Sequence, residues 1–309
     1  MIVRLLDLAH DAARSLLATG APVHAFINPV EYHGPHLPLH NDHLISFGLA
    51  KQLHEGSEHP FVYVDDLSIG VEPTRGQGSR HTSFDVARTI VSEACRALAQ
   101  LGATSVVLHT FHGAPLHNLA IEAGVDTLRD AGVRALAPFN AILRELLEVD
   151  GSQYAEAFAH IENRAERDEM IRDLHLDFHG GFFETSMTMH LAASSVSPAY
   201  RLLPPCPAIT PHSLASNASR LARLAGRDVL AKELGLAAFG LGWQALDPFP
   251  GYTGRPHRAT AASGAIFTRH ILDRYRALSS EVLHGGARSP LPIMPWVATL
   301  TAHGRLGVA

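Results

Sequence analysis

Helical and strand patterns alternate along the first half of the chain, and this alternation limits the folds that the chain can adopt. Residues 84–101 carry apolar side chains at helical spacing and are followed by Gly102, a typical residue at a helix end. Residues 105–109 include β-branched side chains, as expected of a buried strand. Helical spacing returns over 116–130, and another short strand is predicted over 132–137. This alternation is typical of an α/β protein with a parallel sheet covered by helices.

The same pattern extends toward both ends of the chain. Residues 22–28 and 61–64 are two further predicted strands, and a predicted helix over 43–53 separates them. Helical spacing resumes over 214–233, after a proline-rich segment around 200–213. We interpret this segment as an extended connector, because proline interrupts both helices and sheets.

The composition favours a soluble protein with a small-molecule partner. A chain of 309 residues that is 46% hydrophobic can bury a large core. The net charge of -5 gives no basic surface for a nucleic acid or an anionic membrane. Charged residues near the N-terminus interrupt the apolar run that a signal peptide needs, and no apolar run reaches membrane-spanning length. The two cysteines, Cys95 and Cys206, are too few for a disulfide framework. We therefore expect a cytoplasmic protein.

Histidine is unusually frequent, with 21 residues against 25 lysines and arginines together. Neutral imidazole is the commonest transition-metal ligand, so this excess favours a metal site. Several histidines, such as His10, His54, His59 and His303, lie in polar stretches that are typical of a protein surface. The metal hypothesis therefore depends on three clusters in which histidines and carboxylates occur together.

The first cluster, residues 28–43, directly follows a predicted strand. Glu31 and His33 are two residues apart, so in an extended backbone both side chains project to one side, as two ligands of one site require. The glycine and prolines that follow favour an irregular loop, which can bring Asp42 back to bridge two cations. The spacing leaves open a polar surface loop in which Asp42 only caps the next helix.

The second cluster lies at the carboxyl end of the predicted strand 105–109, the sheet edge at which open α/β sheets bind ligands. His112 precedes a glycine and is a candidate metal ligand, although a histidine satisfied at a strand end is the alternative. His109 and His117 are weaker candidates, for which we expect supporting or structural roles.

The third cluster, residues 177–186, contains two glycines and precedes a predicted helix that Glu184 opens. A carboxylate at this position is favoured by the helix dipole even without a metal, so a simple first-turn acid is the alternative. His179 has an ionisation suited to proton transfer near neutral pH.

Taken together, these clusters resemble the creatininase family. The pattern Glu-x-His-Gly-x-His-Leu-Pro followed by Asp occurs over 31–42, the strand-end His-Gly pair at 112–113, and His-x-Gly-x-x-Glu-Thr-Ser over 179–186. The segment 251–264 is similar to the closing segment of the family. The resemblance implies a three-layer α/β/α sandwich with a mostly parallel central sheet, in a single domain over residues 1–309 that includes the proline-rich connector.

The resemblance also implies a centre with two divalent metal ions. Glu31, Asp42 and His112 would hold one ion. The second would be held by His33, Asp42 and Glu184, so that Asp42 bridges the two. A mixed set of imidazoles and carboxylates suits zinc or manganese, and iron(II) is also compatible.

Such a centre implies an amidohydrolase in which a metal-bridged hydroxide cleaves a C–N bond. His179 is the candidate proton donor for the leaving nitrogen, and Asp177 is a candidate to orient its imidazole. Arg80 and His81, from a segment rich in glycine and serine, are predicted to bind an anionic group of the substrate. His36 is a third predicted substrate-binding residue.

The resemblance leaves the substrate open among cyclic amides, formamides and small peptide-like amides. Creatinine is not favoured, because creatininases enclose it with tryptophans, whereas Trp243 and Trp296 lie far downstream of the expected positions. The partner would be a small-molecule amide, without nucleic acid or membrane. A homo-oligomer, and by resemblance a hexamer, is also implied.

Two other functions are compatible with a dinuclear centre. The first is a dinuclear phosphoester hydrolase, because the same metal pair can serve in-line displacement. The second is a non-catalytic binding protein that is stabilised by its metals. His179, which need not bind metal, argues against the second function.

Overall fold

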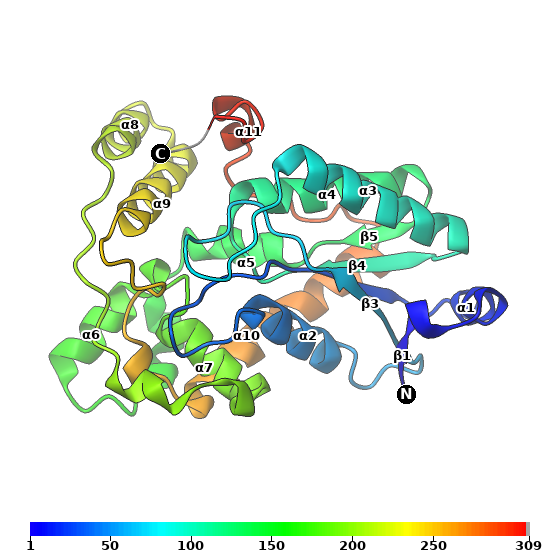
Figure 1. The fold of residues 1–309 in the computed structure, drawn as a ribbon, viewed down its shortest axis with the longest axis horizontal. Helices are drawn as coiled ribbons and strands as arrows, with labels where there is room; N and C mark the ends of the chain where they lie inside the picture. The colour runs from blue at the N-terminus through cyan, green and yellow to red at the C-terminus, as the bar shows by residue number, and fades with distance from the viewer. Residues whose placement is uncertain (307–309) are drawn as a thin grey trace.

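A parallel β-sheet forms the centre of the fold (Figure 1). The structure is a computed structural model that describes residues 1–306. Five strands are paired in the order β1-β3-β2-β4-β5, and every pair is parallel. The strands are β1 (Ile2–Arg4), β2 (Val23–Ile27), β3 (Phe61–Leu67), β4 (Ser105–His109) and β5 (Arg134–Leu136). The predicted α/β fold with a parallel sheet is confirmed.

Helices cover both faces of this sheet and complete the predicted three-layer sandwich (Figure 1). The helices on one face are α1 (His10–Leu17), α3 (Phe84–Leu101) and α4 (Pro115–Asp130). The helices on the other face are α2 (Asn41–Leu53), α5 (Phe139–Leu146) and α10 (Ala261–Ser279).

The remaining helices gather mainly beyond one end of the sheet, on the left in Figure 1. They are α6 (Arg164–Arg172), α7 (Phe182–Leu191), α8 (Ser213–Leu224), α9 (Asp228–Gln244) and the short α11 (Trp296–Leu300), which lies above α4 in this view. Residues 203–212, in the predicted connector, contain neither helix nor strand.

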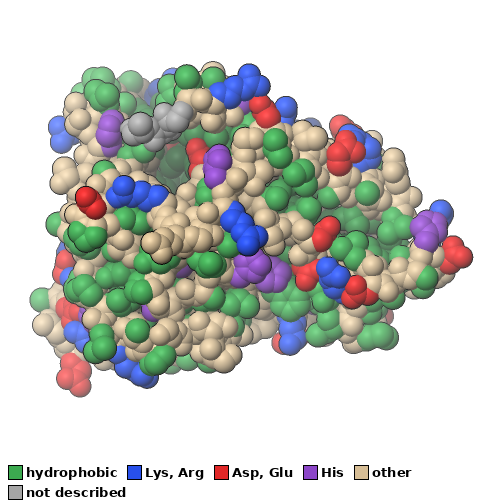
Figure 2. Space-filling view, viewed as in Figure 1, with side chains coloured by type: hydrophobic (Ala, Val, Ile, Leu, Met, Phe, Trp, Pro, Cys, Tyr) green, Lys and Arg blue, Asp and Glu red, His purple; other side chains and the backbone are tan. Residues whose placement is uncertain are grey.

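The surface in view mixes basic and acidic side chains without a continuous basic patch (Figure 2). This distribution agrees with the slightly negative net charge. Within residues 1–306, every helix is too short or too polar to cross a membrane.

Two predicted elements differ from the structure. The single helix predicted over 214–233 is wrong, because α8 ends at Leu224 and α9 begins at Asp228. Gly226 between them has a φ of 70°, a left-handed conformation that ends a helix. Apolar spacing continues across this turn, which is why periodicity alone indicated one helix. β1 was not predicted, because its three residues are too few to show a period.

The strand β2 is buried on both faces, and its side chains alternate between them. Val23, Ala25 and Ile27 belong to the core under α3 and α4. Phe26 points to the opposite side, where it packs with Ala50 of α2. A strand held from both sides is a rigid base for the loop that follows it.

His24 and His109 form a buried pair on the α2 side of the sheet. The Nδ1 atom of His24 lies 2.9 Å from the Nε2 atom of His109, and the two rings are stacked. One nitrogen donates and the other accepts, so the pair is satisfied when both rings are neutral. Burial, together with the charge on His109, lowers the pKa of His24, and burial lowers the pKa of His109 to about 3. The supporting role predicted for His109 is thus a structural one.

This pair should make the protein sensitive to acid. Above pH 6.5, the ordinary pKa of histidine, both rings are neutral in the folded and unfolded states. Between about pH 6.5 and 3 the unfolded chain binds a proton at His109 that the folded pair cannot, so this histidine lowers the free energy of unfolding by ~1.4 kcal/mol per pH unit. His24, whose pKa is also lowered, contributes in the same direction. Chemical denaturation of the double variant His24→Phe, His109→Phe should show a shallower fall. An identical slope in both proteins would contradict this account.

Candidate metal centre

The predicted ligands lie on loops and helix starts at the carboxyl ends of the strands. Glu31 and His33 lie on the loop after β2, and His112 lies on the loop after β4. Asp42 is in the first turn of α2, and Glu184 is in the first turn of α7. Ligands of open α/β sheets bind at this edge.

These five side chains form two groups that share Asp42. Its Oδ1 atom lies 3.1 Å from Nε2 of His33, which is 3.7 Å from Oε2 of Glu184. The other oxygen, Oδ2, lies 3.8 Å from Nδ1 of His112, which is 2.9 Å from Oε2 of Glu31. In each group, the candidate ligand atoms are all within 4.8 Å of one another. One carboxylate therefore faces two neighbouring groups of ligands.

The backbone orients both histidines toward these carboxylates. Nδ1 of His33 donates to the Glu31 carbonyl oxygen at 3.1 Å, which leaves Nε2 to face Asp42. Nε2 of His112 donates to the Val71 carbonyl oxygen at 3.0 Å, so that Nδ1 faces Glu31. Metal-binding histidines in proteins are generally held in this way through the second ring nitrogen.

The buried carboxylates and imidazoles shift one another's pKa values. Burial alone would lower the pKa of His33, but the carboxylates of Asp42 and Glu184 outweigh it and raise the pKa to about 10. The carboxylate of Glu31 likewise outweighs the burial of His112, whose pKa rises to about 9. Among residues 1–306, no lysine or arginine forms an ion pair with the three carboxylates. The cluster therefore has an excess of negative charge, which divalent cations would balance.

Two carboxylate oxygens indicate that the cluster fits cations. Within residues 1–306, Oε2 of Glu31 and Oδ2 of Asp42 are buried and have no hydrogen-bond partner. Burial of a carboxylate oxygen without a hydrogen-bond partner destabilises the folded protein. The other oxygen of Glu31 accepts from the Thr74 amide at 2.5 Å, so the unpartnered one is the oxygen that faces His112. Oxygen and imidazole donors of this kind suit zinc, manganese or iron(II).

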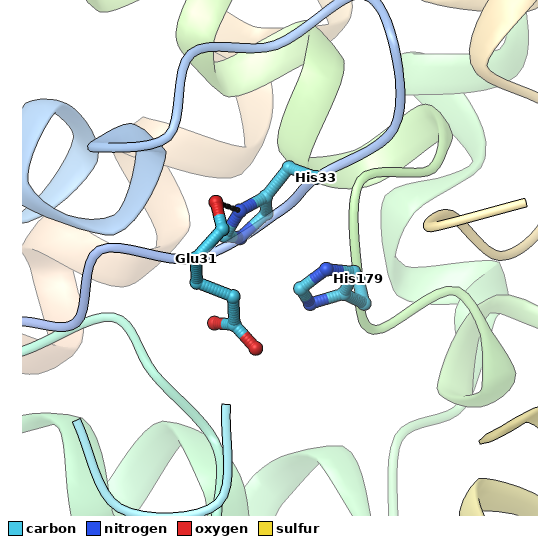
Figure 3. Close-up of side chains that lie close together, drawn as sticks. All are labelled: Glu31, His33 and His179. Carbon is cyan, nitrogen blue, oxygen red and sulfur yellow. Dashed lines mark hydrogen bonds between the residues drawn. The ribbon is translucent and has the colours of Figure 1, made fainter. Parts of the chain in front are cut away.

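His179 lies beside this cluster (Figure 3). Its ring stacks on His33 with 4.0 Å between the ring centres, and its Nε2 donates to the Tyr32 carbonyl oxygen at 2.9 Å. Burial and the charge on His33 lower the pKa of His179 to about 3, so the ring is neutral. The hydrogen bond to Tyr32 leaves Nδ1 as the basic nitrogen.

Asp177 contacts the start of α7 and not, as predicted, the ring of His179. Its Oδ2 atom accepts from the Phe182 amide at 3.0 Å, at the start of α7. Burial raises the pKa of this carboxyl to about 7, although the amides of Phe182 and Phe183 work in the opposite direction. No hydrogen bond joins Asp177 to the His179 ring among residues 1–306. Asp177 thus holds the helix that carries Glu184.

The three predicted substrate-binding residues differ in exposure and in their contacts. Arg80 and His81 are exposed, and the amide of Arg80 donates to the Val30 carbonyl oxygen at 2.9 Å. His36 is buried, and its Nε2 lies 2.8 Å from Oγ1 of Thr185. His36 therefore contacts α7 beside the cluster.

Sequence reasoning missed Thr74, whose amide holds Glu31 and whose Oγ1 donates to the Tyr32 carbonyl oxygen at 2.8 Å. Two glycines flank this segment, and a side chain at Gly70 or Gly76 would collide with the loop after β2. This pair of glycines is a signal of close backbone approach that the sequence does contain.

Trp243 was also missed as a neighbour of the site. Its ring centre lies 5.0 Å from that of His179, and its Nε1 donates to the Tyr252 carbonyl oxygen at 3.0 Å. Distance along the sequence had suggested that Trp243 lies away from the site. The fold brings α9 back to it, so the position of this tryptophan in the sequence does not argue against any substrate.

Comparison with known proteins gives consistent matches. The family described as creatininase, creatinine amidohydrolase, matches residues 7–278. A search of curated protein sequences found no match. Similar solved structures include creatinine amidohydrolase (creatininase) and a manganese creatininase, each 16% identical with a TM-score of 0.56, and a mutant creatininase of Zn-Zn type, 16% identical with a TM-score of 0.57. Each alignment covers 91% of this chain and 98% of the other.

Proposed function

Since this chain belongs to the creatininase family, we propose that it hydrolyses a C–N bond of a small-molecule amide with two divalent cations bound in the cluster. Membership makes it a metal-dependent amidohydrolase. The observation that carries the two-cation proposal is the position of Asp42, whose two oxygens face two different groups of ligands. Zinc and manganese are the expected ions, which the names of the similar structures support.

We assign the five ligands to two sites. Glu31, Asp42 and His112 hold the first cation, and His33, Asp42 and Glu184 hold the second. Each imidazole presents the nitrogen that its backbone contact leaves free. The tautomers needed for binding are therefore set before a cation arrives.

When bound, two neighbouring cations lower the pKa of a water from about 15.7 toward neutrality and polarise a substrate carbonyl. The side chains must then move one proton. Water adds to the carbonyl carbon and loses a proton, and the C–N bond breaks only when the nitrogen receives one.

His179 is the residue that we propose for this transfer. Its ring is neutral, and the hydrogen bond from Nε2 to the Tyr32 carbonyl leaves Nδ1 free to accept the proton from water. The same nitrogen then returns the proton to the leaving amine. Stacking on His33 and contact with Trp243 hold the ring in place.

Asp177 acts in this scheme as a positioning residue. Its contact with the Phe182 amide supports the start of α7, from which Glu184 reaches the second cation. His36 acts on the same helix through Thr185. Arg80 and His81 stay candidates for an anionic substrate group, since the amide of Arg80 donates to the carbonyl of Val30, next to Glu31.

A phosphoester hydrolase is less compatible with this site. Transfer of a phosphoryl group requires positive side chains around its oxygens. Arg75, the nearest arginine to Thr74 in sequence, donates instead to the Leu246 carbonyl and lies over the Phe249 ring. A non-catalytic role does not explain why the neutral ring of His179 is held beside the cluster.

Self-association and a single domain over residues 1–309 are part of the proposal. Leu214, Leu221 and Leu224 of α8 are 74%, 67% and 85% exposed, which is costly for an isolated chain. The ligands come from both sides of residue 150, which supports one domain. The cytoplasmic location stays a prediction.

Metal analysis and a substrate screen test this function. We expect close to two zinc or manganese ions per chain, and hydrolysis of at least one amide in a set of lactams, formamides and peptide amides. The protein freed of metal should be inactive and should recover when zinc or manganese is returned. Full activity without metal, or a single cation per chain, would refute the dinuclear mechanism.

A further inference from the structure

The segment 71–74, between β3 and α3, has an unusual backbone at Glu72. Its φ is 55°, in the left-handed region that side chains other than glycine, asparagine and aspartate seldom adopt. A strained residue of this kind persists only where its surroundings hold it, and such residues concentrate at functional sites.

This turn directs two backbone groups at the proposed first cation site. The Val71 carbonyl, just before it, accepts from Nε2 of His112 at 3.0 Å. The Thr74 amide, just after it, donates to Oε1 of Glu31 at 2.5 Å. A single segment therefore orients two ligands of the same cation, and the left-handed residue lies between the two contacts.

The Glu72 side chain connects this segment to α4, the helix that follows His112. Its Oε2 atom lies 3.4 Å from the Leu116 amide, in the first turn of α4. The N-cap of this helix is Ala114, whose side chain cannot accept a hydrogen bond from the amides of the first turn. Burial raises the pKa of the Glu72 carboxyl, whereas the Leu116 amide and the charges on His112 and His81 lower it. When ionised, the Glu72 carboxylate is close enough to interact with the charge on His112.

We propose that Glu72 is a positioning residue for the cation held by Glu31, Asp42 and His112, whose affinity it raises through its charge and through the turn that it forms. The inference rests on the proposed dinuclear function. Two ligands of the second site are held by other contacts: the Glu31 carbonyl orients His33, and the Gly180 amide donates to Glu184. Glu72 therefore acts on one cation of the two.

The substitution Glu72→Gln tests the charge. Glutamine keeps the size of the side chain, and its carbonyl can still accept from the Leu116 amide, so a merely structural role would be preserved. We expect zinc titration of the metal-free variant, in competition with a chelator, to show one cation bound roughly ten- to a hundredfold more weakly. The affinity of the other cation and the thermal midpoint of the metal-free protein should equal those of the wild type.

The substitution Glu72→Gly removes the carboxylate and keeps the turn. Glycine adopts a positive φ without strain, so the backbone contacts to His112 and Glu31 are kept while the carboxylate is lost. Weakening of one cation in both variants supports the proposal. Unchanged affinity in Glu72→Gln, whether or not Glu72→Gly is weakened, overturns it. Glu55→Gln, the same change at an exposed residue just after α2, should bind both cations as the wild type does.

A double-mutant cycle identifies the affected site. In a His112→Ala background the first site is already impaired, so Glu72→Gln should have no further effect on the remaining cation. A further loss there would overturn the assignment to the first site. Wild-type protein that binds fewer than two cations would overturn the proposed function together with this inference, whereas normal binding by Glu72→Gln overturns the inference alone.

Discussion

Replacement of Asp42 by alanine is expected to remove both cations and to abolish hydrolysis. The two oxygens of this carboxylate face His33 and His112, so a single substitution takes one ligand from each site. Metal content by mass spectrometry and turnover of the amide found in the screen measure the two losses.

A surface substitution controls for the change of charge. Asp66 lies at the exposed side of β3, and Asp66→Ala should keep two cations and full turnover. Circular dichroism of Asp42→Ala should show the helical content of the wild type, which separates loss of metal from loss of fold. An Asp42→Ala protein that keeps one tightly bound cation would show that Asp42 serves only one site.

Replacement of His179 by alanine is expected to give the opposite pattern, with both cations kept and turnover reduced by about 10²- to 10⁴-fold. The ring donates to the Tyr32 carbonyl and stacks on His33, and neither contact is a ligand bond. Its loss should therefore remove proton transfer and leave the metal sites intact. Added imidazole, which can occupy the space left by the ring, should restore part of the turnover.

Two outcomes would contradict this role of His179. Glu31, His33 and His179 also lie close enough to form a third candidate ligand group, so loss of a cation in His179→Ala would make His179 a ligand. Unchanged turnover would remove it from the reaction altogether. His190→Ala, an exposed substitution on α7, should behave as the wild type in both measurements.

These predictions depend on residues that the sequence indicated before the fold was known. Glu31 and His33 were candidates because residues two apart share one side of an extended chain, and His112 was a candidate because it follows a buried strand. Spacing left open that Asp42 only caps a helix and that Glu184 is only a first-turn acid. Their convergence with the other three in the fold is what makes a shared centre the better interpretation.

The sequence by itself determined the elements whose pattern is local. The helix 84–101 and the strand 105–109 agree with the structure residue for residue, because amphipathic spacing and β-branched runs depend only on near neighbours. The alternation of these elements was also sufficient to predict a parallel sheet. Gly226 and the three-residue β1 were missed because their effect is confined to one turn or to a strand too short for a period.

Only the tertiary structure decided how the ligands are held. The Val71 carbonyl on His112, the Thr74 amide on Glu31 and the Trp243 ring beside His179 join segments that are far apart in the chain. Backbone groups are the same in every residue, so a contact made by a carbonyl or an amide leaves no mark on the residue type. Such contacts exist only once the sheet has brought the loops of different strands to one edge.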